Sequence, residues 1–261
     1  MKKQKEFFKN IWTITSRDFR AYFTSPMAYI VIAGFLVIMG WMFFFNLSHF
    51  NLQNLQYQQF NMGKGVSITE GIIRPLYGNM NVIFLFLVPF ITMRLFAEEK
   101  KIHTIELLMT SPLSLTQIIL GKFFSSFLLV LIMLVLTLVY PIVLFVTGNP
   151  DLGPIASSYL GTLLLTSCYL AIGLVFSSMT ENQIVAGALT FAAGLFFWLV
   201  SWATQAAGPV WSELLMYLSL ISHYNNFSQG IISTSDVFYY LSFITIGLFL
   251  THRVLDSYRW R

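Results

Sequence analysis

Charged side chains are scarce in this sequence. Asp, Glu, Lys and Arg make up only 10% of the 261 residues, whereas a soluble domain carries about 25%. Hydrophobic residues make up 56%, and they include 26 Phe and 12 Tyr, residue types that suit lipid-facing surfaces and interfaces. This composition excludes an ordinary soluble domain. It predicts an all-α integral membrane protein.

Cysteine is almost absent as well. The single one, Cys168, lies in an apolar run, so an internal disulfide is excluded and a packing role is the simplest interpretation. The first 25 residues are basic and aromatic, and they lack the compact apolar core and small-residue cleavage site of a signal peptide. We therefore expect the first span to insert and remain.

The motifs of several functional classes are missing. Gly63-Lys64 and Gly121-Lys122 lack both the earlier glycine and the following Ser or Thr of a phosphate-binding loop. The four histidines are scattered, with no His-Glu-x-x-His or Gly-x-Ser-x-Gly motif. The proposed span cores hold no Asp, Glu, Lys or Arg, which disfavours a gradient-driven transporter. We predict no catalytic, cofactor-binding or metal-binding residues.

Six apolar runs are long enough to cross a membrane. The first is Met27–Phe45, and a polar connection is expected over residues 46–77. Pro89 is expected to kink the second run. Thr180-Glu-Asn-Gln183 has the form of a capping box, which predicts a helix start. The other runs are placed at residues 74–94, 123–150, 152–180, 182–212 and 237–255.

The distribution of Lys and Arg predicts the orientation. Six basic residues precede the first span, four lie between Arg94 and Lys122, and three lie in the C-terminal tail. Only Lys64 and Arg74, of 15 in all, fall on the other side. Because cytoplasmic loops are enriched in basic residues, six spans with both termini in the cytoplasm are expected.

The N-terminal segment has helical periodicity. Over residues 7–23, aromatic residues and a polar set recur at steps of three and four, which is typical of a helix lying in a membrane interface. The alternative is a solvated tail. Ser25-Pro26 breaks the chain, so we divide it into residues 1–25 and a six-helix domain, residues 26–261. The site residues of this segment are Trp12, Arg17, Phe19 and Arg20.

Residues 94–122 form a charged island between two apolar spans. Thr104 is placed to cap a short helix, Ser111-Pro112 to end it, and Ser114-Leu-Thr-Gln117 to start the third span. The simple interpretation is a well-capped loop, and the functional one is a docking surface for a partner. The candidate contact residues are Glu98, Glu99, His103, Thr104, Glu106, Leu107, Leu108, Ser111 and Pro112.

Residues 214–235 carry no charge but many polar side chains, among them His223, Asn225 and Asn226. They are too polar for a span and too apolar for an ordinary loop. Short interfacial or re-entrant helices fit this mixture best.

The island resembles the signature of ABC-2 type transporter permeases, in Phe96-Ala-Glu-Glu99, Thr104-Ile-Glu-Leu-Leu108 and Ser111-Pro112. The segment Arg17–Tyr29 is similar to the branch associated with gliding motility. The family commonly has Gly before the threonine, where this chain has His103, so the local turn is expected to differ.

The resemblance implies an N-terminal elbow helix, a cytoplasmic coupling helix between spans two and three, and re-entrant helices before span six. It also implies a bacterial inner membrane, a separate ATPase subunit that binds ATP and Mg²⁺, and a second copy of this permease or a related one. In the gliding branch an auxiliary membrane subunit with a periplasmic domain is expected, and nucleic acid is not expected. The competing hypotheses are a membrane scaffold that performs mechanical work and a gradient-driven transporter.

Overall fold

The structure is a computed structural model that describes residues 2–59, 67–206 and 208–258. The described part contains helices and no strand. Six stretches are long and apolar enough to cross a membrane, which confirms the predicted fold class. The elements are α1 (Lys2–Thr24), α2 (Pro26–Gln59), the π-helical turn η1 (Thr69–Ile73), α3 (Arg74–Thr92), α4 (Ala97–Lys101), α5 (Ile105–Thr110), α6 (Leu115–Leu136), α7 (Val139–Thr147), α8 (Leu152–Met179), α9 (Gln183–Ala206), α10 (Pro209–Leu218), α11 (Leu220–Ser228) and α12 (Thr234–Tyr258).

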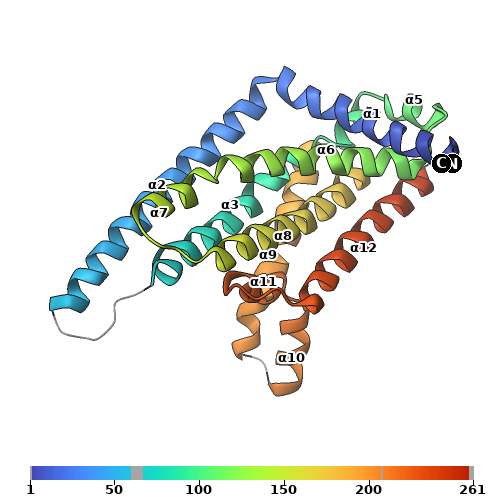
Figure 1. Ribbon diagram of the computed structural model, residues 1–261. Helices are drawn as coiled ribbons and strands as arrows, with labels where there is room; N and C mark the ends of the chain where they lie inside the picture. The colour runs from blue at the N-terminus through green and yellow to red at the C-terminus, as the bar shows by residue number, and fades with distance from the viewer. Residues whose placement is uncertain (1, 60–66, 207, 259–261) are drawn as a thin grey trace.

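The helix α8 lies at the centre of the bundle and packs against α3, α6, α9, α11 and α12 (Figure 1). Small residues allow its neighbours to approach closely. A Cβ on Gly173 would lie 2.1 Å from Thr92 Oγ1 of α3, and one on Gly247 of α12 would lie 2.9 Å from the Cβ of Ala171. Membrane helices lack a strong hydrophobic driving force for association, so such close packing contributes much of their stability.

Both chain termini lie at one end of the bundle, together with α5 (Figure 1). We call this the terminal end. The helices α10 and α11 lie toward the opposite end, beyond α9 and before α12, and α2 also extends to that end. The two short helices α10 and α11 therefore occupy much of the region that was predicted not to span the membrane.

The helix α2 corrects the prediction of a polar connection from residue 46. It continues to Gln59, and π-helical structure and α3 occupy residues 69–77. The amide-rich stretch stays helical because apolar side chains such as Leu47 and Phe50 pack against the core. A helix can therefore continue past the point where its sequence stops being apolar. Lys64, used for the orientation, lies outside the described residues, as do Arg259 and Arg261.

The third span is interrupted near Pro141. Pro141 has no N–H with which to bond the carbonyl of Thr137, and α6 ends at Leu136 while α7 begins at Val139. Pro89, in contrast, lies inside α3, which continues to Thr92. The predicted helix start near Thr180 is real, but its cap is Asn182, whose Oδ1 accepts the N–H of Ile184 at 2.9 Å.

Candidate functional site

The charged island folds as two short helices held between α3 and α6. After α3 a turn leads into α4, and α5 follows as a six-residue helix that ends at Ser111. The start of α6 has the predicted capping box: Ser114 Oγ accepts the Gln117 N–H at 3.3 Å, and Gln117 Oε1 accepts the Ser114 N–H at 2.9 Å. The predicted short helix, its end at Ser111 and the new helix start at Ser114 are therefore all present.

Thr104 occupies the N-cap position of α5 but does not cap it as predicted. Its backbone is already helical, with φ −80° and ψ −12°, and its side chain makes no capping bond. The hydroxyl donates instead to the carbonyl of Glu99, at 3.4 Å. Its hydrogen bond closes the turn between α4 and α5.

His103 holds the left-handed backbone conformation that glycine adopts most readily. Its φ is +56°, the only positive φ of a non-glycine residue in the described chain. The turn that glycine would allow is thus kept, contrary to the expectation of a different turn. This conformation costs roughly 1–2 kcal/mol in a residue with a Cβ, so the surrounding bonds impose it.

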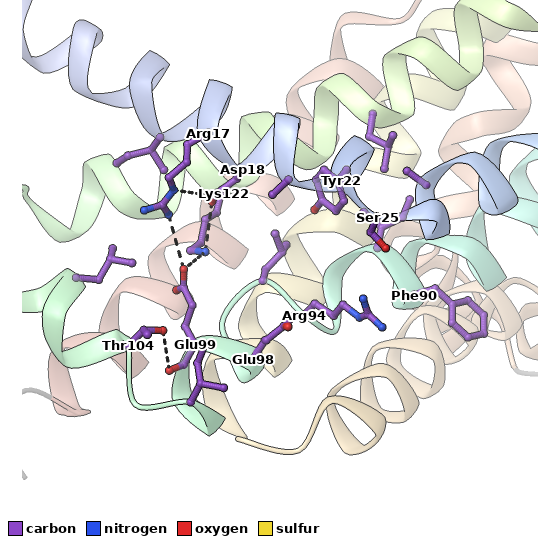
Figure 2. A pocket seen from close by; sticks show the side chains of 18 of the residues that line it. Arg17, Asp18, Tyr22, Ser25, Phe90, Arg94, Glu98, Glu99, Thr104 and Lys122 are labelled. Carbon is purple, nitrogen blue, oxygen red and sulfur yellow. Dashed lines mark hydrogen bonds and ion pairs between the residues drawn. The ribbon is translucent and has the colours of Figure 1, made fainter.

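A charge cluster joins α4 to α1 and α6, and its members are largely buried except for Arg17, whose side chain is 56% exposed. Lys122 Nζ lies 2.7 Å from Glu99 Oε1 and 3.3 Å from Asp18 Oδ2, with only 4% of its side chain exposed. Arg17 bonds Asp18 at 2.8 Å and lies 3.8 Å from Glu99. Two cations and two carboxylates thus connect three elements that are distant in sequence (Figure 2).

The same cluster affects ionisation along α1. Burial alone lowers the pKa of Arg17, but its hydrogen bond to Asp18 and the charges of Asp18 and Glu99 leave the pKa raised overall. Burial, with a further contribution from Asp18, raises the pKa of Tyr22 to about 12. The Tyr22 hydroxyl therefore stays protonated beside Ser126, at 3.3 Å.

Backbone contacts attach the island to the end of α8. Ser177 Oγ accepts the N–H groups of Phe96 and Ala97, at 3.0 and 3.2 Å. The buried Lys100 Nζ donates to the carbonyl of Ser178 at 2.6 Å, which satisfies one of the open carbonyls at the α8 C-terminus. The island is therefore bonded to α8 as well as to α1 and α6.

The helix α1 packs along the first turns of α6 (Figure 1). Its buried face is formed by Ile11, Ile14 and Thr15, and Thr15 Oγ1 donates to the carbonyl of Gly121 at 3.1 Å. A Cβ at Gly121 would overlap Ile14, so glycine allows this contact. Of the predicted elbow residues, Trp12 is 65% exposed, Arg17 enters the charge cluster, Phe19 is half-buried and Arg20 is exposed.

The island side chains fall into two groups. Glu98, Glu106, Leu107 and Pro112 are exposed, as is His103, while Thr104, Leu108 and Ser111 are half-buried. Leu107 is 72% exposed, whereas Leu108 packs against the core. Glu99 is directed inward to Lys122. The predicted contact residues therefore differ in exposure, from the inward-facing Glu99 to the exposed Leu107.

A groove of about 770 Å³ lies between α1, the start of α2, the end of α3 and the island. Apolar residues such as Val31 and Ile91 line it, and Arg94 and Glu98 extend into it (Figure 2). Leu107 and Leu108 also border it. The exposed side of α5 and this groove form one continuous surface at the terminal end.

A second polar cluster lies toward the opposite end. His223 Nδ1 is 2.6 Å from Asp236 Oδ1, and Asn226 Nδ2 donates to Asp236 Oδ2 at 2.8 Å. Asn225, predicted alongside them, is exposed and does not join the cluster. The sequence analysis missed Asp236, which is 3% exposed. Its position directly before an apolar run, near a histidine, was the available signal.

The geometry and the comparisons agree on the class of protein. The model of the "ABC-2 family transporter protein" family matches residues 12–254. The chain belongs to the ABC-2 transporter family. A comparison with curated proteins finds no match. ABC-2 permeases are membrane components of ABC transporters, and this membership indicates a multi-pass membrane subunit that associates with ABC ATPases.

Proposed function

We propose that this ABC-2 protein is a permease subunit whose island, residues 94–122, receives the motion of a separate ATPase and passes it to the spans. One observation carries the proposal. Leu107 is 72% exposed on α5, beside the exposed Glu106, while Ile105 on the same short helix is buried. Leu107 also borders the apolar groove, so α5 and the groove offer a partner one continuous apolar surface.

The connections of the island support transmission of a force. Glu99 binds Lys122 of α6, Ser177 and Ser178 of α8 bind α4, and Arg17 and Asp18 of α1 complete the charge cluster. In this proposal Glu99 positions α4, while Glu98 and Glu106 face the partner. ATP and Mg²⁺ belong to the ATPase, since this sequence has no phosphate-binding loop.

The test uses Leu107→Asp and Glu106→Arg in the complete complex. Both sites are exposed and both changes should leave folding intact, whereas Leu108, half-buried on the core, is unsuitable. Truncating a contact that is desolvated at an interface costs about 2–5 kcal/mol. We expect at least a tenfold loss of co-purified ATPase or of coupled ATP turnover.

A matched control reverses a charge at the other end of the molecule. Glu213 is exposed on α10, and Glu213→Arg should retain the ATPase at the parental level. If Leu107→Asp and Glu106→Arg also assemble and turn over like the parent, α5 is not the contact surface and the proposal fails.

Orientation follows from the same proposal. An ATPase contact at α5 requires the terminal end to face the cytoplasm of a bacterial cell, with the protein in its inner membrane. A reporter fused after residue 261 should then be active only as a cytoplasmic reporter, and one inserted at Lys64 only as a periplasmic reporter. The opposite result at either site would exclude this topology.

A mechanical role is the second candidate, carried by the similarity of Arg17–Tyr29 to the gliding-motility branch. In that case the same ATPase contact would drive movement of an envelope partner, such as an auxiliary subunit with a periplasmic domain. Stimulation of ATP turnover by a small-molecule substrate supports transport. Turnover that responds only to the envelope partner supports the mechanical role.

A further inference from the structure

The side chain of His223 in α11 lies between two hydrogen-bond acceptors. Its Nδ1 is 2.6 Å from Asp236 Oδ1 of α12, and its Nε2 is 3.1 Å from the backbone carbonyl oxygen of Tyr217 in α10. A neutral imidazole carries one N–H group, whereas the imidazolium carries two. Only the charged ring can therefore donate to both acceptors at once.

Two further features of the surroundings favour the charged ring. The Tyr239 ring stacks on the imidazole, with the centroids 3.9 Å apart and 22° between the planes, and the face of a phenol attracts a cation. The Tyr217 carbonyl belongs to the last turn of α10, where the helix dipole also favours a positive charge. Together with Asp236, these groups stabilise an imidazolium from three sides.

Asp236 is held in place by more than the histidine. Its second oxygen, Oδ2, accepts the side-chain N–H of Asn226 at 2.8 Å. It also lies in the first turn of α12, where the helix dipole favours an anion. A hydrogen bond to an ionised acceptor is stronger than one to a neutral carbonyl. A neutral ring should therefore keep its one proton on Nδ1, directed at Asp236.

Loss of the second proton then affects one contact selectively. Nε2 presents a lone pair to the Tyr217 carbonyl oxygen, so a hydrogen bond is replaced by repulsion between two acceptors. The contact between α11 and α12 keeps both of its bonds to Asp236. The helix α10 keeps the bond from the Tyr239 hydroxyl to the Leu218 carbonyl, at 2.8 Å. The last turn of α10 should therefore loosen without detaching.

The other titratable groups around the ring do not compete with this effect. The elements packed against α11 are α8, α9, α10 and α12. The helix α9 has no titratable residue, and Glu213, the one charged residue of α10, is exposed and has no ion pair with the ring in the described structure. The remaining groups, on α8, α10, α11 and the start of α12, are phenols and one buried thiol, which are ordinarily uncharged below about pH 8: Tyr159, Cys168, Tyr169, Tyr217, Tyr224, Tyr239 and Tyr240.

We propose that His223 is a pH-responsive latch on the end of α10, which ties the Tyr217 carbonyl to Asp236 when the ring is protonated and releases that carbonyl when the ring is neutral. Imidazole side chains change charge between about pH 5 and 8. The charged ring is the holding form, so the last turn of α10 is held in mild acid and loosened as the pH rises. The latch does not depend on the proposed function, which decides only which compartment's pH reaches this end of the molecule (Figure 1).

Hydrogen–deuterium exchange of the complete chain in lipid nanodiscs tests the latch. The protein is compared at about pH 5.5 and about pH 8.5, with correction for the intrinsic pH dependence of amide exchange. Protection of residues 214–218 should fall at least about fivefold at the higher pH, while protection of residues 221–228 should change less than about twofold. Equal protection of residues 214–218 at both pH values, or an equal loss in α11, would overturn the latch.

Substitutions separate the latch from other pH effects. His223→Gln cannot gain a proton, so the pH response of residues 214–218 should disappear. The matched control is His49→Gln, at a histidine whose ring bonds Gln53 within α2, and it should keep the parental response. Asp236→Asn removes the charge that favours the imidazolium, so the loss of protection should move to lower pH. A parental response in His223→Gln, its loss in His49→Gln, or an unshifted profile in Asp236→Asn would each contradict the latch. The parental profile needs no variant, so it can refute the latch even if a variant fails to fold.

Discussion

The two ends of the molecule hold their buried charges in different ways. At the terminal end, Lys122 binds Asp18 and Glu99, which lie 104 and 23 residues away in sequence. At the opposite end, Asp236 binds His223 and Asn226, which lie 13 and 10 residues away. The first cluster joins three separate elements, whereas the second connects α11 to the helix that follows it. Loss of a long-range cluster should lower the stability of the whole bundle. Loss of a local cluster should mainly destabilise α11 and the start of α12.

The largest expected effect comes from Lys122→Met, which tests the long-range cluster. Removing this cation leaves Glu99 and Asp18 with only the more exposed Arg17 to neutralise them. Breaking a fully buried ion pair costs about 3–5 kcal/mol, so the loss should lie toward the lower end of that range. We expect a clearly lower thermal unfolding midpoint in detergent. Lys101→Met, at an exposed site two residues from Glu99, should leave the midpoint unchanged. Equal midpoints for both variants would show that the cluster adds no stability.

Asp236→Ala tests the local cluster, with a smaller effect. It leaves His223 and Asn226 without their acceptor, at a cost of about 1–3 kcal/mol. We expect faster hydrogen–deuterium exchange in residues 217–230 and little change in α3 or α6. Asn225→Ala, at the exposed neighbour, is the control. Faster exchange throughout the bundle would remove the distinction between the two ends.

The smallest expected effect compares two caps within the terminal end. Ser114→Ala removes a capping box and should cost about 1 kcal/mol. Thr104→Ala removes only a 3.4 Å bond to a carbonyl and should cost less than half as much. Chemical denaturation of the two variants under matched conditions gives the comparison. Equal losses would mean that Thr104 contributes as a cap despite its geometry.

What the sequence could predict depends on how far apart the interacting residues are. The capping box of Ser114 and Gln117 spans three positions, so its pattern is visible in the sequence, and the structure forms both of its hydrogen bonds. Near Thr180 two capping residues compete, and Asn182 is used instead. A local pattern therefore indicates a helix start more reliably than it indicates the residue that caps it.

The charge cluster could not be predicted in this way. Nothing near Lys122 in the sequence identifies Asp18 as its partner, because their contact depends on the packing of α1 along α6. The buried face of α1 was missed for the same reason. The aromatic stripe with Trp12 suggested the lipid side, but Ile11 and Ile14 are the residues that pack inward. The polarity of residues 46–59 was read as a loop because polarity indicates exposure to water and does not determine backbone conformation.

The central helix α8 is bonded to an element that carries part of each cluster, α4 at one end and α11 at the other. Ser177 and Ser178 bind the island at one end, and near the other end Ser157 Oγ donates to the carbonyl of Phe227 in α11 at 2.6 Å. Binding equilibria at two sites that share such an element obey reciprocity. If a molecule bound near α11 changes the affinity of α5 for its partner by some factor, that partner must change the affinity near α11 by the same factor. Measuring either affinity with and without the other ligand would therefore give one coupling free energy for the whole length of α8.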